Sequence, residues 1–514
     1  MTEDRTEAIR APTRNMNFPI RKSLKGRRAV VIGSTPAGLS AAISLAVRGA
    51  RVVVLESGPV PVPALRPVTI EGWKFLPPAP PLTSPAVLAE LVSTAGLRLT
   101  DFITLERDEV AARVCIGKES VPVLHDPALL AGEIARLGDI NGPRLEALFG
   151  RMGRLREGAE GFLRARAMGV LPSTNALRTL PDLLDCRSEW RQAHQRFPES
   201  AVRSLLLAFH PLAGLMPTTH LNRYWRWLGE FILTGGWRIE GGHQELMRAL
   251  LRLCDLLAVR VICKAKVERI ELKDGKVRQV IAGENNKDLA ASIVVVADGQ
   301  DAAKYAPAVE EWRGARPASR QALLTLYLGL NNEQDLPNPI TLIPSGELHE
   351  ETRAIERWHV PAGMASMAHM KCETPEGDAP EDPVPVTGDD DLHGQVRTRL
   401  AVRMVVPSAS SAWRWNEDQR EQEKRLILER LDDAGVLKDV ADGLEVSELR
   451  ISPLHTQGPQ GDFSWRTLPR RGQKQRVAGL FETRDAQLAG WSLSSEILAG
   501  MAIAVRAARD ARGD

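Results

Sequence analysis

Long hydrophobic runs are missing from this sequence, since no stretch approaches the ~20 apolar residues that a membrane-spanning helix requires. An excess of one charge is missing too: the net charge of +2 over 514 residues favours neither nucleic acid nor a strongly acidic partner. The five cysteines form no CxxC pair, and the ten histidines form no HExxH or similar motif. We therefore expect no metal site, no disulfide framework and a reducing compartment.

The N-terminal segment 1–27 contains basic residues but lacks the apolar core of a secretory signal, and it is predicted to be a disordered tail. The overall composition, with 43% hydrophobic and 26% charged residues, is ordinary for a globular protein. The length predicts two or three domains. We expect a cytoplasmic protein, and peripheral contact with the inner face of a membrane stays open.

A βαβ unit is the first regular pattern in the chain. The apolar run 29–32 is followed by a tight turn at 33–38, a helical stretch at 39–47 and a second apolar run at 51–56 that ends in an acid. Strand, turn, helix and strand within ~30 residues are typical of a dinucleotide-binding domain.

The turn of this unit has the spacing of a phosphate-binding loop with one change. Gly33 and Gly38 occupy the positions of the glycine for the tight bend and the glycine for helix packing. Thr35 stands where a glycine would let the backbone approach pyrophosphate. Glu56 ends the second strand, where a carboxylate would accept hydrogen bonds from ribose hydroxyls. We expect the fold to be kept and dinucleotide binding to be weakened by the branched Thr35 side chain.

The rest of the chain alternates helical and strand-like stretches, beginning with a largely helical pattern over 84–197. Further helices are predicted at 241–257, 418–434 and 494–508, and strands at 259–263, 266–272, 292–297, 322–330 and 401–406. Asp274-Gly275 predicts a hairpin turn. The acidic stretch Glu373–Asp391 is predicted to be a solvated loop without a catalytic part.

Eight segments spread over most of the chain share their order and spacing with a known family. They are VVIGSTPAGLSAAISLAVRGARVVVLES, GWKFLPPAPPLTSPAVLAELVSTAGLRLTDFITLERDEVAARV, LHDPALLAGEIARL, SLLLAFHPLAGLMP, GGWRIEGGHQELMRALLRL, VERIELKDGKVRQV, SIVVVADG and GLFETRDAQLAGWSLSSEILAGMAIA. In these segments the sequence resembles the phytoene desaturase (carotenoid desaturase-like) family within the amine-oxidase-like flavoproteins. The resemblance implies a noncovalent FAD, an apolar tunnel and a hydrophobic polyene or isoprenoid-like substrate. It also implies cofactor contacts at Val267, Asp298, Asp485 and Gly490, besides those of the first turn.

The fold class that follows is α/β: a Rossmann-like FAD-binding core with a discontinuous substrate domain of mixed helices and sheet. The expected FAD-binding parts are 28–83, 235–315 and 471–514. The expected substrate-domain parts are a helical, membrane-facing part at 84–234 and a sheet part at 316–470.

The chain departs from the family pattern at several cofactor positions. The usual Gly-Gly-Arg after Glu56 is replaced by a proline-rich run, and the usual Asp-x-Gly-Pro is replaced at 75–79 by Phe-Leu-Pro-Pro-Ala. Arg484 stands in place of a glycine before Asp485, and the stretch 489–494 has lost glycines. We expect Arg484 to pair either with a cofactor phosphate or with Asp485, and FAD binding to be weakened but retained.

Two further segments have two interpretations each. The segment from Leu205 to Trp227 combines an apolar run with tryptophan and arginine, which is typical of a bilayer interface but also of a buried helix. The glycine-rich segment 235–242 either brings backbone close to flavin or substrate, or forms a hinge. His243 behind it either donates a proton or caps and packs. No set of catalytic side chains can be assembled from the sequence, so the catalytic residues are unassigned.

Two functions from different classes follow. The first is an FAD-dependent oxidoreductase (desaturase, saturase or isomerase) acting on a hydrophobic polyene or isoprenoid-like substrate. The second is a relative that has lost or weakened FAD binding and serves as a lipid-binding or protein-binding component. An NAD(P)-dependent dehydrogenase is less favoured, because the second half of the chain resembles a flavoprotein core. No nucleic-acid partner is expected.

Overall fold

The structure is a computed structural model of the chain. It describes residues 23–61, 67–117, 119–136, 142–170, 173–174, 178, 201–215, 221–283, 287–309, 321–332, 334, 340–345, 350–351, 353, 365–372, 398–407, 416–437, 440–453, 477–486 and 492–512.

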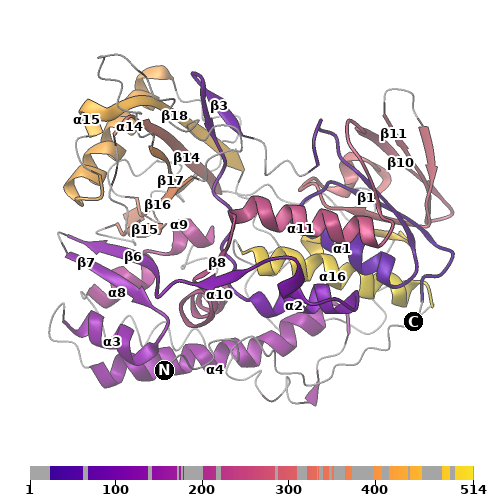
Figure 1. The fold of residues 1–514 in the computed structure, drawn as a ribbon, viewed down its shortest axis with the longest axis horizontal. Coiled ribbons are helices and arrows are strands. Elements are labelled where there is room, and N and C mark those ends of the chain that lie inside the picture. Colours follow the sequence, from indigo (N-terminus) through magenta and orange to yellow (C-terminus); the bar gives the residue numbers. More distant parts are fainter. Residues whose placement is uncertain are drawn as a thin grey trace, which may run out of the picture.

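A five-stranded parallel sheet forms the centre of one half of the molecule, at the right of Figure 1. In spatial order its strands are β19 (Leu480–Glu482), β13 (Ile293–Val296), β1 (Arg28–Ile32), β2 (Arg51–Leu55) and β9 (Arg260–Ile262). The first strand in sequence, β1, therefore lies in the middle. From it the chain continues to β2 on one side and later to β13 on the other. This strand order creates the switch point at which α/β folds bind their ligands.

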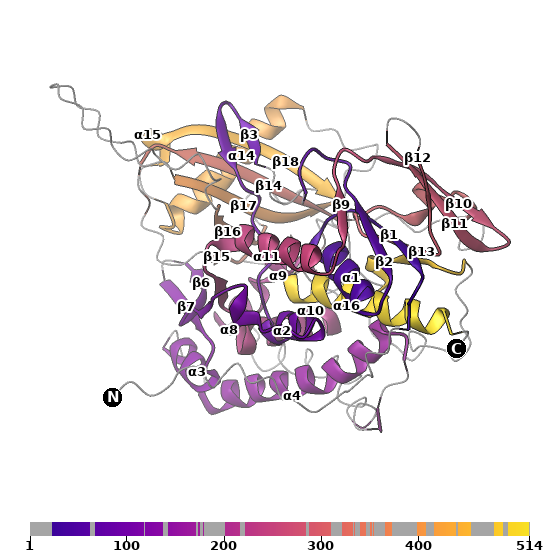
Figure 2. The ribbon, with the colours of Figure 1, turned by 45° about the vertical axis from the view of Figure 1, so that its right-hand side comes forward.

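Both faces of this sheet are covered, which explains why its strands are hydrophobic almost throughout. Ala29 and Val31 pack toward the helices α1 (Pro36–Val47), α2 (Pro85–Thr94), α11 (Gly242–Leu256) and α16 (Leu493–Asp510). Val30 and Ile32 pack toward a three-stranded antiparallel sheet at the right of Figure 2. That sheet consists of β10 (Val267–Lys273), β11 (Lys276–Ala282) and β12 (Lys287–Ala290). The parallel sheet is thus the middle layer of three.

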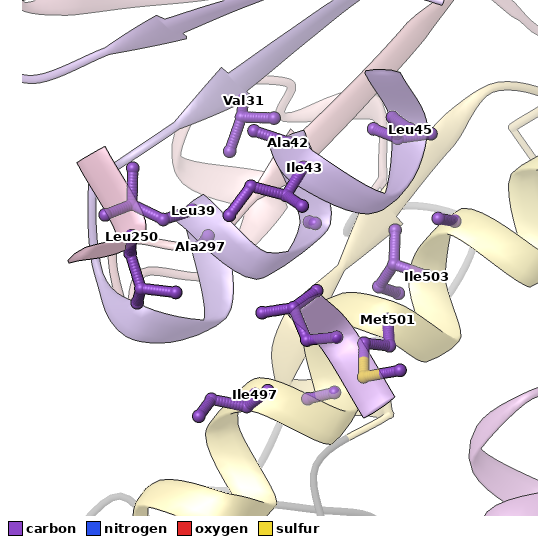
Figure 3. Packing of buried hydrophobic residues seen from close by; sticks show 14 of the residues in the cluster. Val31, Leu39, Ala42, Ile43, Leu45, Leu250, Ala297, Ile497, Met501 and Ile503 are labelled. Carbon is purple, nitrogen blue, oxygen red and sulfur yellow. The ribbon is translucent and has the colours of Figure 1, made fainter. Parts of the chain in front are cut away.

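Helices α1 and α16 pack against each other at unusually short range. Figure 3 shows Leu39 and Ile43 of α1 and Ile497 and Met501 of α16, which belong to one apolar cluster. At Gly500 a Cβ atom would lie 2.3 Å from the carbonyl oxygen of Ala37. The two backbones can approach this closely only because α16 carries a glycine there.

The second half of the molecule is built on a seven-stranded sheet, at the upper left of Figure 1. In spatial order its strands are β18 (Leu444–Pro453), β14 (Gln321–Leu330), β17 (Thr398–Pro407), β16 (Met367–Lys371), β15 (Ile340–Ile343), β6 (Val110–Ile116) and β7 (Glu119–Leu124). One face packs on α14 (Glu417–Asp433), beside the short α15 (Val440–Gly443). On the other face, Tyr327 and Ala401 meet the hairpin of β3 (Val68–Ile70) and β4 (Trp73–Phe75).

The expectation of a largely helical pattern over 84–197 is wrong for 105–124. This part contains β5 (Leu105–Arg107), which pairs with β8 (Trp237–Ile239), as well as β6 and β7. β6 joins the large sheet by pairing with β15, more than two hundred residues later. A single sequence gives no sign of such a distant partner, which explains the error.

A bundle of helices lies against this sheet and forms its own apolar cluster with it. Its members are α3 (Pro127–Ala135), α4 (Gly142–Ala167), α8 (Ala201–Leu207), α9 (His210–Ala213) and α10 (Leu221–Thr234). Trp227 of α10 is 0% exposed and Trp225 is 5% exposed. The interpretation that these rings meet a membrane is therefore wrong, and the alternative of a buried helix is confirmed. Within the described residues, no helix is both long and apolar enough to cross a bilayer.

Most of the other predicted elements are confirmed within one to three residues. The helix predicted at 418–434 is α14, the helix at 494–508 is α16, and the hairpin at Asp274-Gly275 joins β10 to β11. Both turn residues have positive φ, as a two-residue hairpin turn requires. The acidic stretch 373–391 lies outside the described residues.

We predict that Gly500→Ala destabilises the protein by about 1–3 kcal/mol, because a methyl group cannot fit against the α1 backbone. Gly132→Ala in α3 is the matched control, since nothing lies within 4 Å of its missing Cβ. It should be neutral or stabilise by about 0.5–1 kcal/mol through helix propensity. Urea unfolding of both variants measures the difference, and equal free energies of unfolding would contradict the close packing.

Candidate functional site

The candidate site lies at the carboxyl ends of β1, β2 and β13, where segments distant in sequence meet. Gly33 follows β1 with a φ of 96°, and a Cβ there would lie 2.8 Å from the Cα of Asp298. At Gly38 in α1, a Cβ would lie 2.1 Å from the carbonyl oxygen of Gly33. Both glycines therefore have the geometry expected of them, one for the bend and one for close packing of helix on turn.

Thr35 caps α1 with its own side chain. Its hydroxyl oxygen accepts the Gly38 N–H at 3.1 Å and donates to the carbonyl oxygen of Ala297 at 2.8 Å. Of the first amides of α1, Pro36 has no N–H and the Gly38 N–H is bonded to Thr35. The Ala37 N–H takes part in neither contact. The helix N-terminus therefore keeps its positive end but offers an anion fewer free donors than a glycine turn would.

Glu56 is buried, and the chain itself surrounds its carboxylate with donors. Oε2 accepts the Ser34 hydroxyl at 2.8 Å and the Ser34 N–H at 3.2 Å. Oε1 accepts the Gly58 N–H at 3.0 Å and the Ser57 hydroxyl at 3.4 Å. Only 2% of the residue is exposed. The acid predicted to meet ribose thus stands at the predicted place, but its bonds now go to the chain.

Asp298 and Tyr305 close the same edge from the β13 side. The Tyr305 hydroxyl donates to Oδ2 of Asp298, and Oδ1 accepts the Gln300 N–H at 3.1 Å. Burial, together with the charges of Asp298 and Glu56, raises the pKa of Tyr305 well above its ordinary range. The phenol therefore stays protonated and keeps donating. No motif singled out Tyr305 in the sequence, although it lies seven residues after the predicted Asp298.

The remaining predicted contacts are spread more widely. Val267 is buried among the apolar side chains between the three-stranded sheet and the parallel sheet. Asp485 is exposed after β19, and its carbonyl oxygen accepts from Arg506 of α16 at 3.5 Å. Arg484 forms an ion pair with Asp301 at 3.5 Å, an acid that the sequence analysis did not name as its partner. Gly490 lies outside the described residues.

A buried polar network that sequence reasoning missed ties the start of α16 to the helical bundle. The Thr83 hydroxyl donates to Oε1 of Glu230 at 2.5 Å, so the Ser492 hydroxyl, 2.7 Å away, must be the donor to Thr83. Arg226 holds the other oxygen of Glu230 at 2.6 Å. The Leu493 N–H also donates to the carbonyl oxygen of Pro81 at 3.1 Å. The proline-rich segment thus packs onto the first turn of α16.

The glycine-rich segment after α10 makes its close approaches to protein atoms. A Cβ at Gly236 would lie 1.9 Å from Nε2 of His125, and one at Gly235 would lie 2.3 Å from the Phe231 carbonyl oxygen. His243 behind the segment is 7% exposed, and burial lowers its pKa to about 4. A neutral buried imidazole fits the packing interpretation of His243.

A second buried cluster lies between α9 and β16. The carboxylate of Glu351 accepts the N–H and the hydroxyl of Ser366 at 2.8 and 3.0 Å, and it lies 3.1 Å from Nε2 of His210. Burial alone would raise the pKa of Glu351, but His210 and the serine hydrogen bonds outweigh it and lower the pKa. Glu351 and His210 are fully buried, and their contacts join α9 to the segment that carries Ser366.

The fold has a Rossmann-like core, formed by the parallel sheet and its glycine turn, and solved structures of other proteins share it. Solved structures that share it are an oxidoreductase from Methanosarcina mazei (13% identity, TM-score 0.55, covering 92% of this chain and 99% of that one) and PF1083 from Pyrococcus furiosus (14%, 0.52, 95% and 97%). A CLA-producing fatty acid isomerase from P. acnes has the same fold (12% identity, TM-score 0.52, covering 93% of this chain and 97% of that one). A comparison with models of known protein families finds no match.

In its sequence the chain is similar to carotenoid desaturases. The chain is 27% identical over 333 residues to a lycopene-forming phytoene desaturase from Pseudescherichia vulneris, covering 59% of this chain and 64% of the relative. It is 27% identical over 357 residues to an all-trans-zeta-carotene desaturase from Myxococcus xanthus, covering 65% and 66%. The chain thus matches slightly less than two thirds of the length of these relatives. The resemblance to the phytoene desaturase family is confirmed.

The buried His369 generates a prediction about pH. It lies on β16 with 1% exposure, neither ring nitrogen meets a hydrogen-bond partner within the described residues, and burial lowers its pKa to about 4. Because the unfolded chain takes up this proton near pH 6.5, the stability from neutral His369 is complete above that pH. It is lost at about 1.4 kcal/mol per pH unit as the pH falls toward 4.

His369→Leu should therefore lower the slope of the free energy of unfolding against pH, between pH 6.5 and 4, by an amount that corresponds to about one proton. Urea unfolding of wild type and variant at a series of pH values from 7 to 4.5 measures this. Parallel curves over that range would contradict the buried neutral histidine. Above pH 6.5 the slopes should agree, which serves as the internal control.

Proposed function

We propose that this protein is an FAD-dependent oxidoreductase acting on a hydrophobic polyene or isoprenoid-like substrate. The observation that carries the proposal is the turn at the switch point of the parallel sheet. Gly33, Gly38 and Glu56 lie there at the positions typical of a dinucleotide-binding turn, with Thr35 in place of its middle glycine. The sequence similarity to desaturases named for phytoene and zeta-carotene supports the substrate class.

The residues at this edge fit an FAD in backbone shape and only partly in free donors. The bend at Gly33 would admit the pyrophosphate beside the N-terminus of α1, and Glu56 would receive the ribose hydroxyls. Asp298 would lie against the adenine half. Glu56 and Asp298 have hydrogen-bond partners within the chain, and the Thr35 hydroxyl takes the Gly38 amide. We therefore propose that FAD binds more weakly than to an unobstructed glycine turn, although it still binds.

A bound flavin would supply the hydride acceptor or donor, and the protein would position the substrate and exclude water. The side chains around the start of α16 suit the second task, because Thr83, Ser492 and Glu230 satisfy one another. Because the two hydroxyls are hydrogen-bonded and Arg226 neutralises the Glu230 carboxylate, no unpaired charge would lie beside an apolar ligand there. A polyene dissolves in membranes, so we place the protein in the cytoplasm at the inner face of the membrane.

The alternative proposal is a protein of the same fold that binds lipid or a partner and has lost FAD. The internal bonds of Glu56 and the cap made by Thr35 favour it. The two proposals differ in one property: only the enzyme binds FAD saturably.

We predict that the purified protein takes up added FAD with a weakened affinity. Losing two or three charge-assisted contacts at ~1.5–3 kcal/mol each lowers affinity by several orders of magnitude, so partly empty protein is expected on purification. Titration of FAD followed by flavin fluorescence measures the binding. Anaerobic mixing of the loaded protein with phytoene in detergent should then bleach the visible flavin band. Absence of saturable binding at high micromolar FAD contradicts the enzyme and leaves the binding protein.

A further inference from the structure

The contact between Ser34 and Glu56 has a geometry that bears on ligand affinity. Ser34 is 0% exposed, and both its N–H and its hydroxyl donate to the same oxygen, Oε2 of Glu56. The hydroxyl bond, at 2.8 Å, is the shorter of the two. We call this pair of hydrogen bonds the Ser34–Glu56 clasp.

We propose that the Ser34 hydroxyl limits the affinity of the site for adenine dinucleotides, because a ribose must displace it from Glu56. The proposal rests on the proposed function, since it assumes that the switch-point edge binds FAD. It concerns a residue of this chain, and the dinucleotide-binding pattern assigns no role to a side chain at this position.

The capacity of the carboxylate explains the competition. A carboxylate has about four lone-pair sites. Ser34 supplies donors to one oxygen, while Gly58 and Ser57 supply donors to the other. A ribose diol brings two donors of its own, so its hydrogen bonds replace existing ones and add little net free energy.

The clasp is held in place at both ends by the sheet. The Gly33 N–H donates to the Leu55 carbonyl oxygen at 2.9 Å, which joins the turn before Ser34 to β2. The Glu56 N–H donates to the Ile262 carbonyl oxygen at 2.8 Å, which joins the acid to β9. These contacts fix the backbone of the turn before Ser34 and the backbone of Glu56, so the two residues stay side by side. The Ser34 hydroxyl, by contrast, can be removed by substitution without touching the backbone.

The clasp also predicts which ligands are affected. FAD and ADP carry the adenosine ribose with its two free hydroxyls, whereas FMN lacks the adenosine half. Removing the Ser34 hydroxyl should therefore raise the affinity for FAD and ADP and leave the affinity for FMN unchanged. A general destabilisation of the fold would change the affinities for all three ligands together.

The test compares Ser34→Ala with wild type and with Ser44→Ala by calorimetric titration of FAD, ADP and FMN. Ser44 is a matched control, since it is a buried serine of α1 whose hydroxyl has no hydrogen-bond partner within the described part of the chain. We expect Ser34→Ala to bind FAD and ADP roughly tenfold more tightly, as loss of one hydrogen bond to a charged group implies. Ser44→Ala and all FMN titrations should match wild type.

The outcomes separate this inference from the proposed function. If wild type binds FAD and Ser34→Ala binds it equally or more weakly, the clasp is not the limiting contact, while the oxidoreductase proposal stands. If neither protein binds FAD, both proposals are overturned. Binding by the variant alone supports the clasp. Should Ser34→Ala show a lowered melting temperature, Ser34→Gly, which also lacks the hydroxyl, must show the same gain in FAD and ADP affinity.

Discussion

The structure depends on backbone contacts that only glycine permits. The start of α1 lies against the turn after β1 because Gly38 has no Cβ, and α16 lies against α1 because Gly500 has none. Gly33 lets the same turn pass beside Asp298 at the end of β13. These contacts bring the ends of β1 and β13 and the N-terminus of α1 together, at the edge of the sheet where Glu56 ends β2.

Once this edge is assembled, its polar groups must be satisfied, because an unpaired buried polar group costs about 1–3 kcal/mol. A bound dinucleotide would satisfy them in a flavoprotein. Here Thr35 satisfies the helix amide, Ser34 satisfies Glu56, and Tyr305 satisfies Asp298. These contacts within the chain therefore stabilise the edge.

The sequence allowed the parallel sheet, its glycine turn and most helices to be predicted, because these are local patterns of period and spacing. It did not allow β6 to be predicted, since that strand depends on a partner far along the chain. Glu56 was assigned correctly as the acid at the end of β2, but its partner Ser34 was not, because which donors reach a carboxylate depends on the folded turn. Trp225 and Trp227 were left with two interpretations for a similar reason: the composition of their segment fits either a membrane interface or a buried helix, and only the packing decides between them.

Amide hydrogen exchange at Ser34 and Gly58 tests the central claim most directly. Both amides donate to Glu56 in the free protein, at 3.2 and 3.0 Å. We predict that, without ligand, both amides exchange as slowly as the neighbouring amides of β1, and that saturating FAD changes their protection because ribose competes for the same carboxylate. Rapid exchange of both amides in the free protein would contradict the claim, because it would show Glu56 free to receive a ribose.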